Sequence, residues 1–171
     1  MKNLVVIGQG YVGLPLSRAA SGAGFNVTGL DVSQAIVDNL NSGCSHVEDI
    51  SNADLQTMLE QGYQATTDNC VIQEADVVVI CVPTPLGDAG RPDLHAVEAA
   101  TRSIAENLHR QSLVILESTT YPGTTEELLL PALEEGGREL DQDFYLAFSP
   151  ERIDPGNKTY RLENTPKLVG G

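Results

Sequence analysis

The chain has few basic residues and no long apolar run. Its 171 residues include 10 Lys and Arg against 24 Asp and Glu, so the formal net charge is -14. Binding to nucleic-acid phosphates, or to an anionic membrane surface, needs clustered Lys and Arg, so we exclude both kinds of partner. No apolar run approaches the roughly 18 residues of a membrane-spanning helix. The excess of acid predicts a salt-rich habitat, because salt screens self-repulsion of this kind.

Cysteine, proline and glycine are also too scarce for several classes of protein. With 3 Cys, 9 Pro and 16 Gly, the composition excludes a disulfide scaffold, collagen and low-complexity disorder. An odd number of cysteines without a C-x-x-C pair is typical of reduced thiols in the cytosol. Residues 1–7 are too short for the h-region of a signal peptide, which takes about 7–15 apolar residues. We therefore expect a cytoplasmic protein, and the scattered histidines predict no metal site.

Short β-branched runs alternate with longer amphipathic stretches along the whole chain. The expected strands are residues 4–7, 27–30, 63–67, 77–82, 113–116 and 144–148. The run at 77–82 lacks polar alternation, which indicates a strand covered on both faces, whereas 63–67 is more polar and suits an edge. This alternation predicts one α/β domain over residues 1–171. Its expected fold is a doubly wound, Rossmann-type, mainly parallel sheet of at least six strands with helices on both faces.

Helices are expected in the gaps between these strands. Two run over residues 11–23 and 34–41, and a third follows the capping pair Ser51 and Asp54 and ends at Gly62. A fourth covers 94–108 behind a capping Asp93. Thr124 and Glu127 have the spacing of a capping box for the fifth. Residues 165–171 read as the start of a further strand, so we expect the chain to be a piece of a longer protein.

A glycine-rich loop follows the first strand and opens the first helix. Gly8 suits a tight turn, Gly10 lets the backbone approach a pyrophosphate, and Gly13 allows close packing of helix on strand. The pyrophosphate is then expected at the helix N-terminus. Asp31 ends the second strand, where a carboxylate can accept both ribose hydroxyls and repel a 2′-phosphate, which favours NAD over NADP. The alternative is a cluster of turn glycines with an ordinary capping aspartate.

Three later strand ends carry polar or proline-rich segments, at residues 81–86, 117–123 and 148–157. The prolines on either side of Thr84 are expected to stiffen its loop and to fix the direction of its hydroxyl. Ligands bind at the carboxyl ends of strands in folds of this class. These segments therefore lie where the nicotinamide end of a dinucleotide is expected.

With these segments the chain resembles the nucleotide-sugar 6-dehydrogenases that act on UDP-sugars. The resemblance runs from Gly-Tyr-Val-Gly-Leu-Pro at 10–15 to Lys-Leu-Val-Gly-Gly at 167–171. Residues 117–125 and 149–157 are most similar to the branch that oxidises UDP-N-acetylhexosamines, particularly UDP-N-acetylglucosamine. The UDP-glucose branch usually has Pro-Glu-Phe-Leu where this chain has Pro-Glu-Arg-Ile at 150–153.

The resemblance implies a four-electron oxidation of the sugar C6 alcohol to a carboxylate, with two NAD molecules and a UDP-sugar as substrate. It assigns the adenosine diphosphate part of NAD to Gly8, Gly10, Tyr11, Val12, Gly13 and Asp31. It assigns the nicotinamide side to Val82, Pro83, Thr84 and Thr119. Thr119 is also the residue expected to help hold a water near the reacting carbon. Glu151 takes the place of the acid/base or water-positioning glutamate, and Arg152 is a candidate contact for substrate or cofactor charge.

The chain departs from the family pattern at two positions. Many relatives have a basic residue five positions after the ribose aspartate, where this chain has Ile36. Many UDP-glucose enzymes have a second acid four residues after the first, where this chain has Pro155. An auxiliary adenosine contact and a second acidic cofactor contact are therefore not expected.

The nucleophilic cysteine of the family, with a lysine and an asparagine, lies in later domains. We expect 1–171 to be an N-terminal NAD-binding domain without the central helical and C-terminal UDP-binding domains, so that it binds NAD but oxidises no sugar. Cys81 is expected to be a buried small hydrophobe. Full-length protein is expected to be a homo-oligomer. Two alternatives stay open: a UDP-glucose or UDP-N-acetylmannosamine 6-dehydrogenase, and a non-catalytic NAD-binding or regulatory module.

Overall fold

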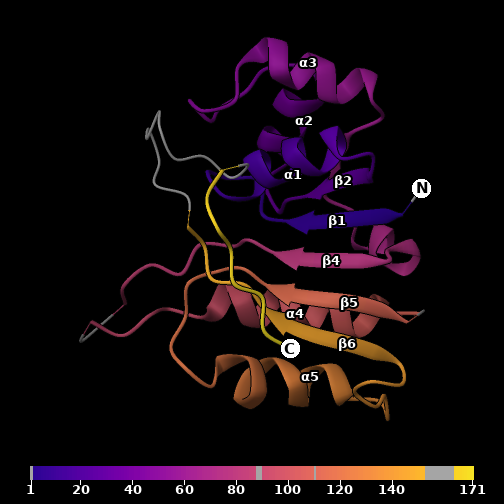
Figure 1. Ribbon diagram of the computed structural model, residues 1–171, viewed down its shortest axis with the longest axis vertical. Helices are drawn as coiled ribbons and strands as arrows, with labels where there is room; N and C mark the ends of the chain where they lie inside the picture. The colour runs from indigo at the N-terminus through magenta and orange to yellow at the C-terminus, as the bar shows by residue number, and fades with distance from the viewer. Residues whose placement is uncertain (1, 88–89, 110, 153–163) are drawn as a thin grey trace.

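One six-stranded parallel sheet forms the centre of the molecule. The computed structural model describes residues 2–87, 90–109, 111–152 and 164–171. The strand order is β3-β2-β1-β4-β5-β6, and every pairing is parallel. The strands are β1 (Asn3–Ile7), β2 (Asn26–Leu30), β3 (Gln64–Thr66), β4 (Val77–Ile80), β5 (Ser112–Leu116) and β6 (Phe144–Phe148). Their carboxyl ends lie along one edge, on the left in Figure 1. The Rossmann-type prediction is confirmed, with the short polar strand β3 at an edge.

Helices cover both faces of this sheet. The helical elements are α1 (Gly13–Gly22), α2 (Gln34–Asn41), α3 (Asn52–Glu60), η1 (Asn69–Glu74), α4 (His95–Asn107), η3 (Thr125–Leu129) and α5 (Leu130–Glu134). In Figure 1, α1, α2 and α3 gather near β1 and β2, whereas α5 lies near β6. Among the described residues, no helix is both long enough and apolar enough to cross a membrane.

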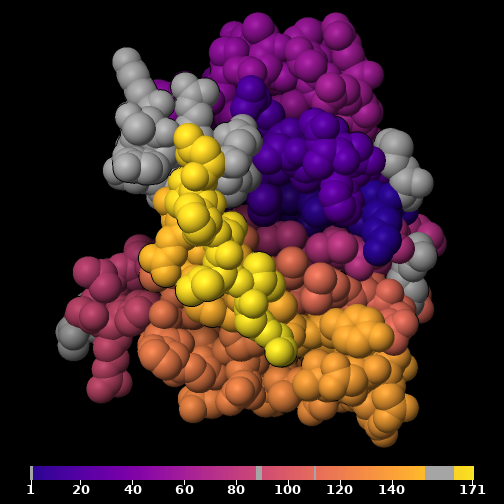
Figure 2. All heavy atoms as spheres, viewed as in Figure 1, coloured from indigo at the N-terminus to yellow at the C-terminus, as the bar shows by residue number. Residues whose placement is uncertain are grey.

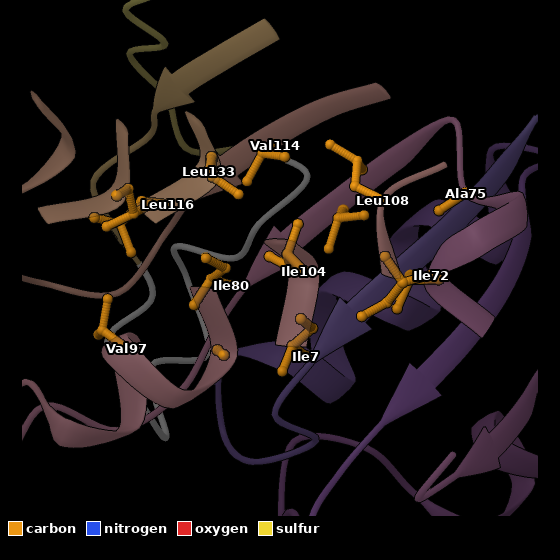
Figure 3. Packing of buried hydrophobic residues seen from close by; sticks show 14 of the residues in the cluster. Ile7, Ile72, Ala75, Ile80, Val97, Ile104, Leu108, Val114, Leu116 and Leu133 are labelled. Carbon is orange, nitrogen blue, oxygen red and sulfur yellow. The ribbon is translucent and has the colours of Figure 1, made fainter. Parts of the chain in front are cut away.

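Two hydrophobic clusters hold these layers together, one on each face of the sheet. Successive strand residues point to opposite faces, so Val78 and Ile80 of β4 join the cluster that contains α4 and α5. Val79 and Cys81 join the cluster that contains α1, α2 and α3. Figure 3 shows part of the first cluster, with Ile80 among side chains of β5 and α4. The uninterrupted apolar run of β4 is therefore explained by burial on both faces.

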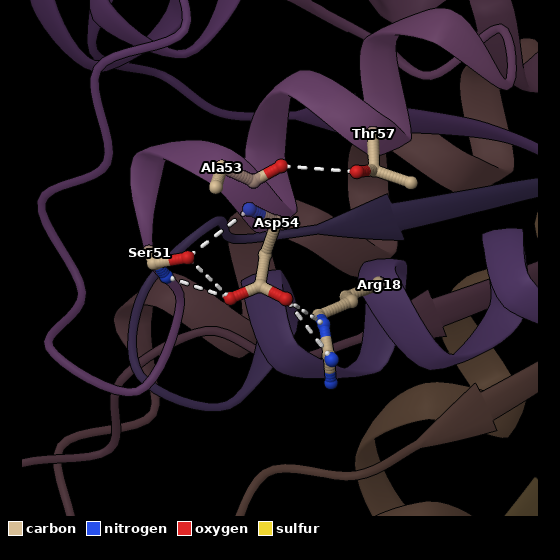
Figure 4. A network of polar contacts seen from close by, with 5 residues as sticks. All are labelled: Arg18, Ser51, Ala53, Asp54 and Thr57. Carbon is tan, nitrogen blue, oxygen red and sulfur yellow. Dashed lines mark hydrogen bonds and ion pairs between the residues drawn. The ribbon is translucent and has the colours of Figure 1, made fainter.

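The predicted capping pair of α3 is confirmed and also braces α1. The Ser51 hydroxyl accepts the Asp54 amide at 3.1 Å, and the Asp54 carboxylate accepts the Ser51 amide at 3.1 Å. Arg18 of α1 donates from Nε to the same carboxylate at 3.1 Å, as Figure 4 shows. These contacts hold the pKa of Asp54 below its usual value, first through the Ser51 hydroxyl, then through the Ser51 amide and then through Arg18. The helix that follows the glycine loop is thus tied to its neighbour.

The capping box predicted at Thr124 and Glu127 is wrong. Thr124 already has helical dihedrals, φ -52° and ψ -40°, and its hydroxyl donates to the Tyr121 carbonyl at 2.7 Å. The following turn, η3, is a π-helix that leads into α5 at Pro131. Proline lacks the amide hydrogen of a regular turn, and its ring crowds the carbonyl four residues earlier. The wider π turn makes room for that ring.

Three element ends also differ from expectation. The strand expected at 77–82 ends at Ile80. Helix α4 begins at His95 after Leu94, and the expected cap Asp93 lies one residue earlier, where its carboxylate accepts the His95 amide at 3.0 Å. The strand expected at 165–171 is reduced to one antiparallel bridge between Gly170 and Phe148. Gly170 exchanges both of its backbone hydrogen bonds with Phe148 at the end of β6, at 2.7 and 3.0 Å. Since the pairing stops at this one residue, the described part of the segment forms no strand.

Candidate cofactor and substrate site

The glycine loop is held against the ends of β2 and β4. The Gly8 amide donates to the Leu30 carbonyl at 2.8 Å, and Gly8 has a φ of +90°. A Cβ on Gly8 would lie 2.8 Å from the Cys81 carbonyl oxygen, and one on Gly13 would lie 1.8 Å from the Gly8 carbonyl oxygen. A Cβ on Gly10 would meet no protein atom within 4 Å. The loop is therefore closed on the protein side and open on the outer side, which fits a bound pyrophosphate.

A buried polar network lies under this loop. Gln9 is fully buried, and its side-chain amide donates to the Val6 carbonyl at 2.8 Å. Its Oε1 accepts the Tyr63 hydroxyl at 2.8 Å and the Ser17 hydroxyl at 3.2 Å. Burial raises the pKa of Tyr63, and the charge of Asp31 acts in the same direction, so the phenol remains a donor. Every polar atom of the Gln9 side chain is thus engaged in fixing the loop.

The network depends on Gly29 in β2, which sequence reasoning did not single out. A Cβ on Gly29 would lie 2.5 Å from both the Gln9 Cδ and the Tyr63 hydroxyl oxygen. A glycine inside a strand often marks such a close approach of another group. That glycine was the only local signal of the network in the sequence. The partners themselves come from distant segments.

Asp31 lies at the end of β2, beside the glycine loop. Its Oδ2 accepts the Gln9 amide at 2.8 Å, and its Oδ1 accepts the Ser33 amide at 2.9 Å. The carboxylate is therefore fixed in direction while remaining only half-buried. Val32, the next residue, is 101% exposed, and Tyr11 of the glycine loop is 51% exposed. This arrangement offers an anchored acceptor next to open apolar surface, as a ribose and its base require.

The segments after β4 and β5 are joined by two hydrogen bonds. The Ser118 hydroxyl donates to the Val82 carbonyl at 2.7 Å. The Thr84 hydroxyl donates to the Thr119 carbonyl at 2.7 Å. The structure therefore brings Val82, Thr84 and Thr119 together, with Pro83 between the first two. The Thr84 hydroxyl, expected to point in a fixed direction, has its hydrogen directed to this loop carbonyl.

An ionic cluster lies at the ends of β5 and β6. Glu117 follows β5 and is 3% exposed. The Lys167 ammonium contacts its Oε1 and lies 4.0 Å from the Oε2 of Glu151, which follows β6. Burial lowers the pKa of Lys167, and the ammonium is in direct contact with the Glu117 carboxylate. Sequence reasoning named Glu151 but missed both Glu117 and Lys167.

The remaining predicted residues have plainer positions. Arg152 is exposed, and its amide donates to the Glu151 Oε1 at 2.5 Å. Cys81 is 7% exposed, and burial raises the pKa of its thiol, in keeping with a small core side chain. Ile36 packs against the cluster containing α1, α2 and α3. Pro155 lies outside the described residues.

Taken with the fold, these contacts define a class of protein. A parallel sheet whose order reverses between β1 and β4 carries a glycine loop at the reversal and an anchored acid at the end of β2. This is the arrangement of a dinucleotide-binding Rossmann domain. Comparison with known proteins then gives the family. The model of the UDP-glucose/GDP-mannose dehydrogenase family, NAD binding domain, matches residues 2–171. The chain belongs to this family, and its cofactor is NAD.

Curated relatives and solved structures agree with this assignment. The chain is 36% identical to UDP-N-acetyl-D-glucosamine 6-dehydrogenase of Pseudomonas aeruginosa, over 100% of the chain and 40% of the relative. It is 38% identical to UDP-N-acetyl-D-mannosamine dehydrogenase of Pyrococcus horikoshii, over 98% and 40%. NDP-N-acetyl-D-galactosaminuronic acid dehydrogenase from Methanosarcina mazei superposes with a TM-score of 0.90 at 32% identity, over 100% and 39%. The chain thus spans about 40% of the length of these relatives.

Proposed function

We propose that this chain is the N-terminal, NAD-binding domain of a UDP-N-acetylhexosamine 6-dehydrogenase. The full-length enzyme would oxidise the C6 alcohol of UDP-N-acetylglucosamine to the uronate, a precursor for polysaccharide synthesis. Each turnover consumes one water and reduces two NAD, which removes four electrons from the sugar carbon. In this proposal the central helical and C-terminal UDP-binding domains follow residue 171, and the full-length protein is a cytoplasmic homo-oligomer.

The observation that carries this proposal is the placement of two groups along one sheet edge. The glycine loop and Asp31 lie at the ends of β1 and β2, and Thr119 and Glu151 follow the ends of β5 and β6. A dinucleotide whose adenosine end lies at Asp31 can extend across the edge toward the second group. Bound NAD would supply the hydride acceptor at that end. The site therefore has a cofactor half and a polar half, as an alcohol dehydrogenation requires.

Each half has residues suited to a role. The amides of the loop residues Gly10, Tyr11, Val12 and Gly13 would face the pyrophosphate, and Asp31 would accept the ribose hydroxyls. Val82, Pro83 and Thr84 would line the nicotinamide. Thr119 would hold a water near the reacting carbon, and Glu151 would accept a proton from it or orient it. Arg152, which is exposed beside Glu151, would meet a charge of the substrate or cofactor.

The experiment is a substrate panel with the full-length protein. UDP-N-acetylglucosamine, UDP-N-acetylmannosamine and UDP-glucose are compared by NADH formation, and the products are quantified in parallel. We expect the highest kcat/KM with UDP-N-acetylglucosamine and two NADH per uronate formed. A preference for another UDP-sugar would move the protein to another branch. NAD binding without oxidation of any sugar would identify a non-catalytic NAD-binding module instead.

The domain assignment has its own test. The isolated chain 1–171 is expected to bind NAD, as followed by isothermal titration calorimetry, and to form no NADH from any UDP-sugar. Sugar-dependent NADH formation by the isolated chain would contradict the assignment of the nucleophile to a later domain. Light scattering of the full-length protein tests the oligomeric state.

A further inference from the structure

Lys167 lies between two acidic side chains that come from neighbouring strand ends. Its ammonium contacts Glu117 after β5 and lies 4.0 Å from the Oε2 of Glu151 after β6. The side chains of Lys167, Glu117 and Glu151 are 22%, 4% and 10% exposed. The segment that carries Lys167 runs over the surface beside β6 and is held there by the bridge between Gly170 and Phe148 (Figures 1 and 2). Residues from three separate segments thus meet at the polar half of the site.

The environment of Glu117 explains why a cation is required here. A carboxylate that is almost entirely buried is costly unless a cation or several donors compensate its charge. Lys167 provides that compensation through a direct contact. The same ammonium is close enough to Glu151 to attract its second oxygen, since attraction between opposite charges is strong at this distance in a poorly solvated region.

Glu151 is consequently held from two directions. Its Oε1 accepts the Arg152 amide at 2.5 Å, and its Oε2 faces the Lys167 ammonium. A carboxylate that moves a proton or orients a water needs a fixed position, because small misplacements lower the rate strongly. Glu117, which is anchored at the end of β5, in turn holds the ammonium in place.

We propose that Lys167 is a positioning residue that aims the Glu151 carboxylate, with Glu117 as its anchor. This inference rests on the proposed function, because it takes Glu151 as the group that acts on the substrate or its water. Lys167 touches neither substrate nor cofactor in this role. Its effect on the reaction therefore passes through Glu151 and is absent when Glu151 is absent.

The test is a mutant cycle in the full-length enzyme. Lys167→Met keeps most of the aliphatic stem and removes the charge, and Glu151→Gln removes the carboxylate. We expect Lys167→Met to lower kcat about 10–100-fold, the range of a misaligned catalytic group, with KM for NAD unchanged within about twofold. In the double variant, kcat should equal that of Glu151→Gln alone. A residue that acts only as a structural brace would add its own loss to that of Glu151→Gln.

Controls separate this role from general damage. Lys2→Met removes the same charge at the exposed N-terminal end of the sheet and should leave kcat unchanged. Lys167→Arg keeps the positive charge and should restore part of the lost kcat. It also carries the mutant cycle if Lys167→Met does not fold, with the same absence of an additional loss in the Glu151→Gln background.

Three results would overturn the inference. They are wild-type kcat in both Lys167 variants, losses that multiply in the double variant, and a rise in KM for the sugar with kcat unchanged. The last result would make Lys167 a substrate contact. Failure of the proposed function is recognised separately, because the wild-type enzyme would then reduce no NAD with any UDP-sugar.

Discussion

The Tyr63 hydroxyl donates a hydrogen bond to Oε1 of Gln9 over 2.8 Å, although the two residues lie 54 positions apart in the sequence. Tyr63 immediately precedes the edge strand β3, and Gln9 stands between the first two glycines of the cofactor loop. A residue beside the edge strand β3 therefore holds the side chain of a cofactor-loop residue in place. This relationship makes the shape of the loop depend on a buried residue of a distant segment.

Removal of this hydroxyl should weaken both the fold and the binding of NAD. In Tyr63→Phe, the buried Gln9 oxygen keeps, among the residues that the structure describes, only the Ser17 hydroxyl as a partner. Loss of one buried hydrogen bond costs about 1–2 kcal/mol, which urea unfolding of the chain would measure. Calorimetric titration should show weaker NAD binding.

Tyr145→Phe is the control, because Tyr145 is 44% exposed. Loss of its hydroxyl should change the free energy of unfolding by less than about 0.5 kcal/mol. Equal effects of the two changes would refute the supporting role of Tyr63.

Two glycine substitutions should separate stability from cofactor binding. In Gly29→Ala, the new Cβ would lie 2.5 Å from Gln9 and Tyr63 atoms, so overpacking should cost about 1–3 kcal/mol. In Gly10→Ala, the Cβ meets no protein atom, so stability should stay within about 0.5 kcal/mol of the wild type. NAD affinity should nevertheless fall sharply, since the methyl group would occupy the space that the pyrophosphate needs.

Gly22→Ala is the matched control for Gly10→Ala. Its Cβ also meets nothing within 4 Å, but Gly22 lies at the far end of α1. It should leave NAD binding unchanged in the same calorimetric titration. Normal NAD affinity in Gly10→Ala would argue that the pyrophosphate does not approach the loop at this point.

Much of the sheet could be predicted from the sequence, because its signals are local. The apolar runs, the turn glycines and the capping pair of Ser51 and Asp54 each depend on residues a few positions apart. The contacts that join distant segments had no such signal. Tyr63 with Gln9, and Lys167 with Glu117 50 positions away, are recognisable only once the strands are in order.

The error at Thr124 has a different cause. Its spacing to Glu127 is that of a capping box, but a stronger local constraint, Pro131, altered the helix that it was expected to begin. A proline shortly after a capping pattern is therefore a reason to expect a distorted first turn. The roles of Thr119, Glu151 and Arg152 stay predictions, since they concern contacts with a bound substrate and cofactor.

Asp31 should determine the preference between the two nicotinamide cofactors. Asp31→Asn removes the negative charge that would repel a 2′-phosphate and keeps an acceptor oxygen. We expect the ratio of NAD to NADP affinity to fall at least about tenfold, which corresponds to 1.4 kcal/mol. Titration of the isolated chain with each cofactor measures this ratio. Because Asp31 also accepts the Gln9 and Ser33 amides, a melting curve must accompany the titration. An unchanged ratio in a folded variant would place the ribose elsewhere.

Asp54 should contribute a pH-dependent part of the stability. Its pKa is lowered in the folded state, so its contribution is complete above the unfolded pKa of about 3.9 and is lost as pH falls through the folded value. Asp54→Asn should therefore cost about 1 kcal/mol near neutral pH and almost nothing well below pH 3. Urea unfolding at several pH values measures the difference.

Glu60→Gln, at the C-terminal end of α3, is the control. It should raise the free energy of unfolding near neutral pH, because a negative charge there opposes the helix dipole.

The net charge of -14 should make the stability of the chain depend on salt. At low ionic strength the acidic side chains repel one another over about 30 Å, whereas at 1 M salt the screening length is about 3 Å. Potassium chloride should therefore raise the melting temperature of the chain up to the concentration at which screening is complete. Screening should at the same time weaken surface ion pairs such as Arg18 with Asp54, but the excess of 14 negative charges makes the loss of repulsion the larger effect. Sodium chloride at equal ionic strength is the control, because screening does not distinguish the two cations. A melting temperature that stays constant or falls with either salt would show that self-repulsion is unimportant, and it would remove the argument for a salt-rich habitat.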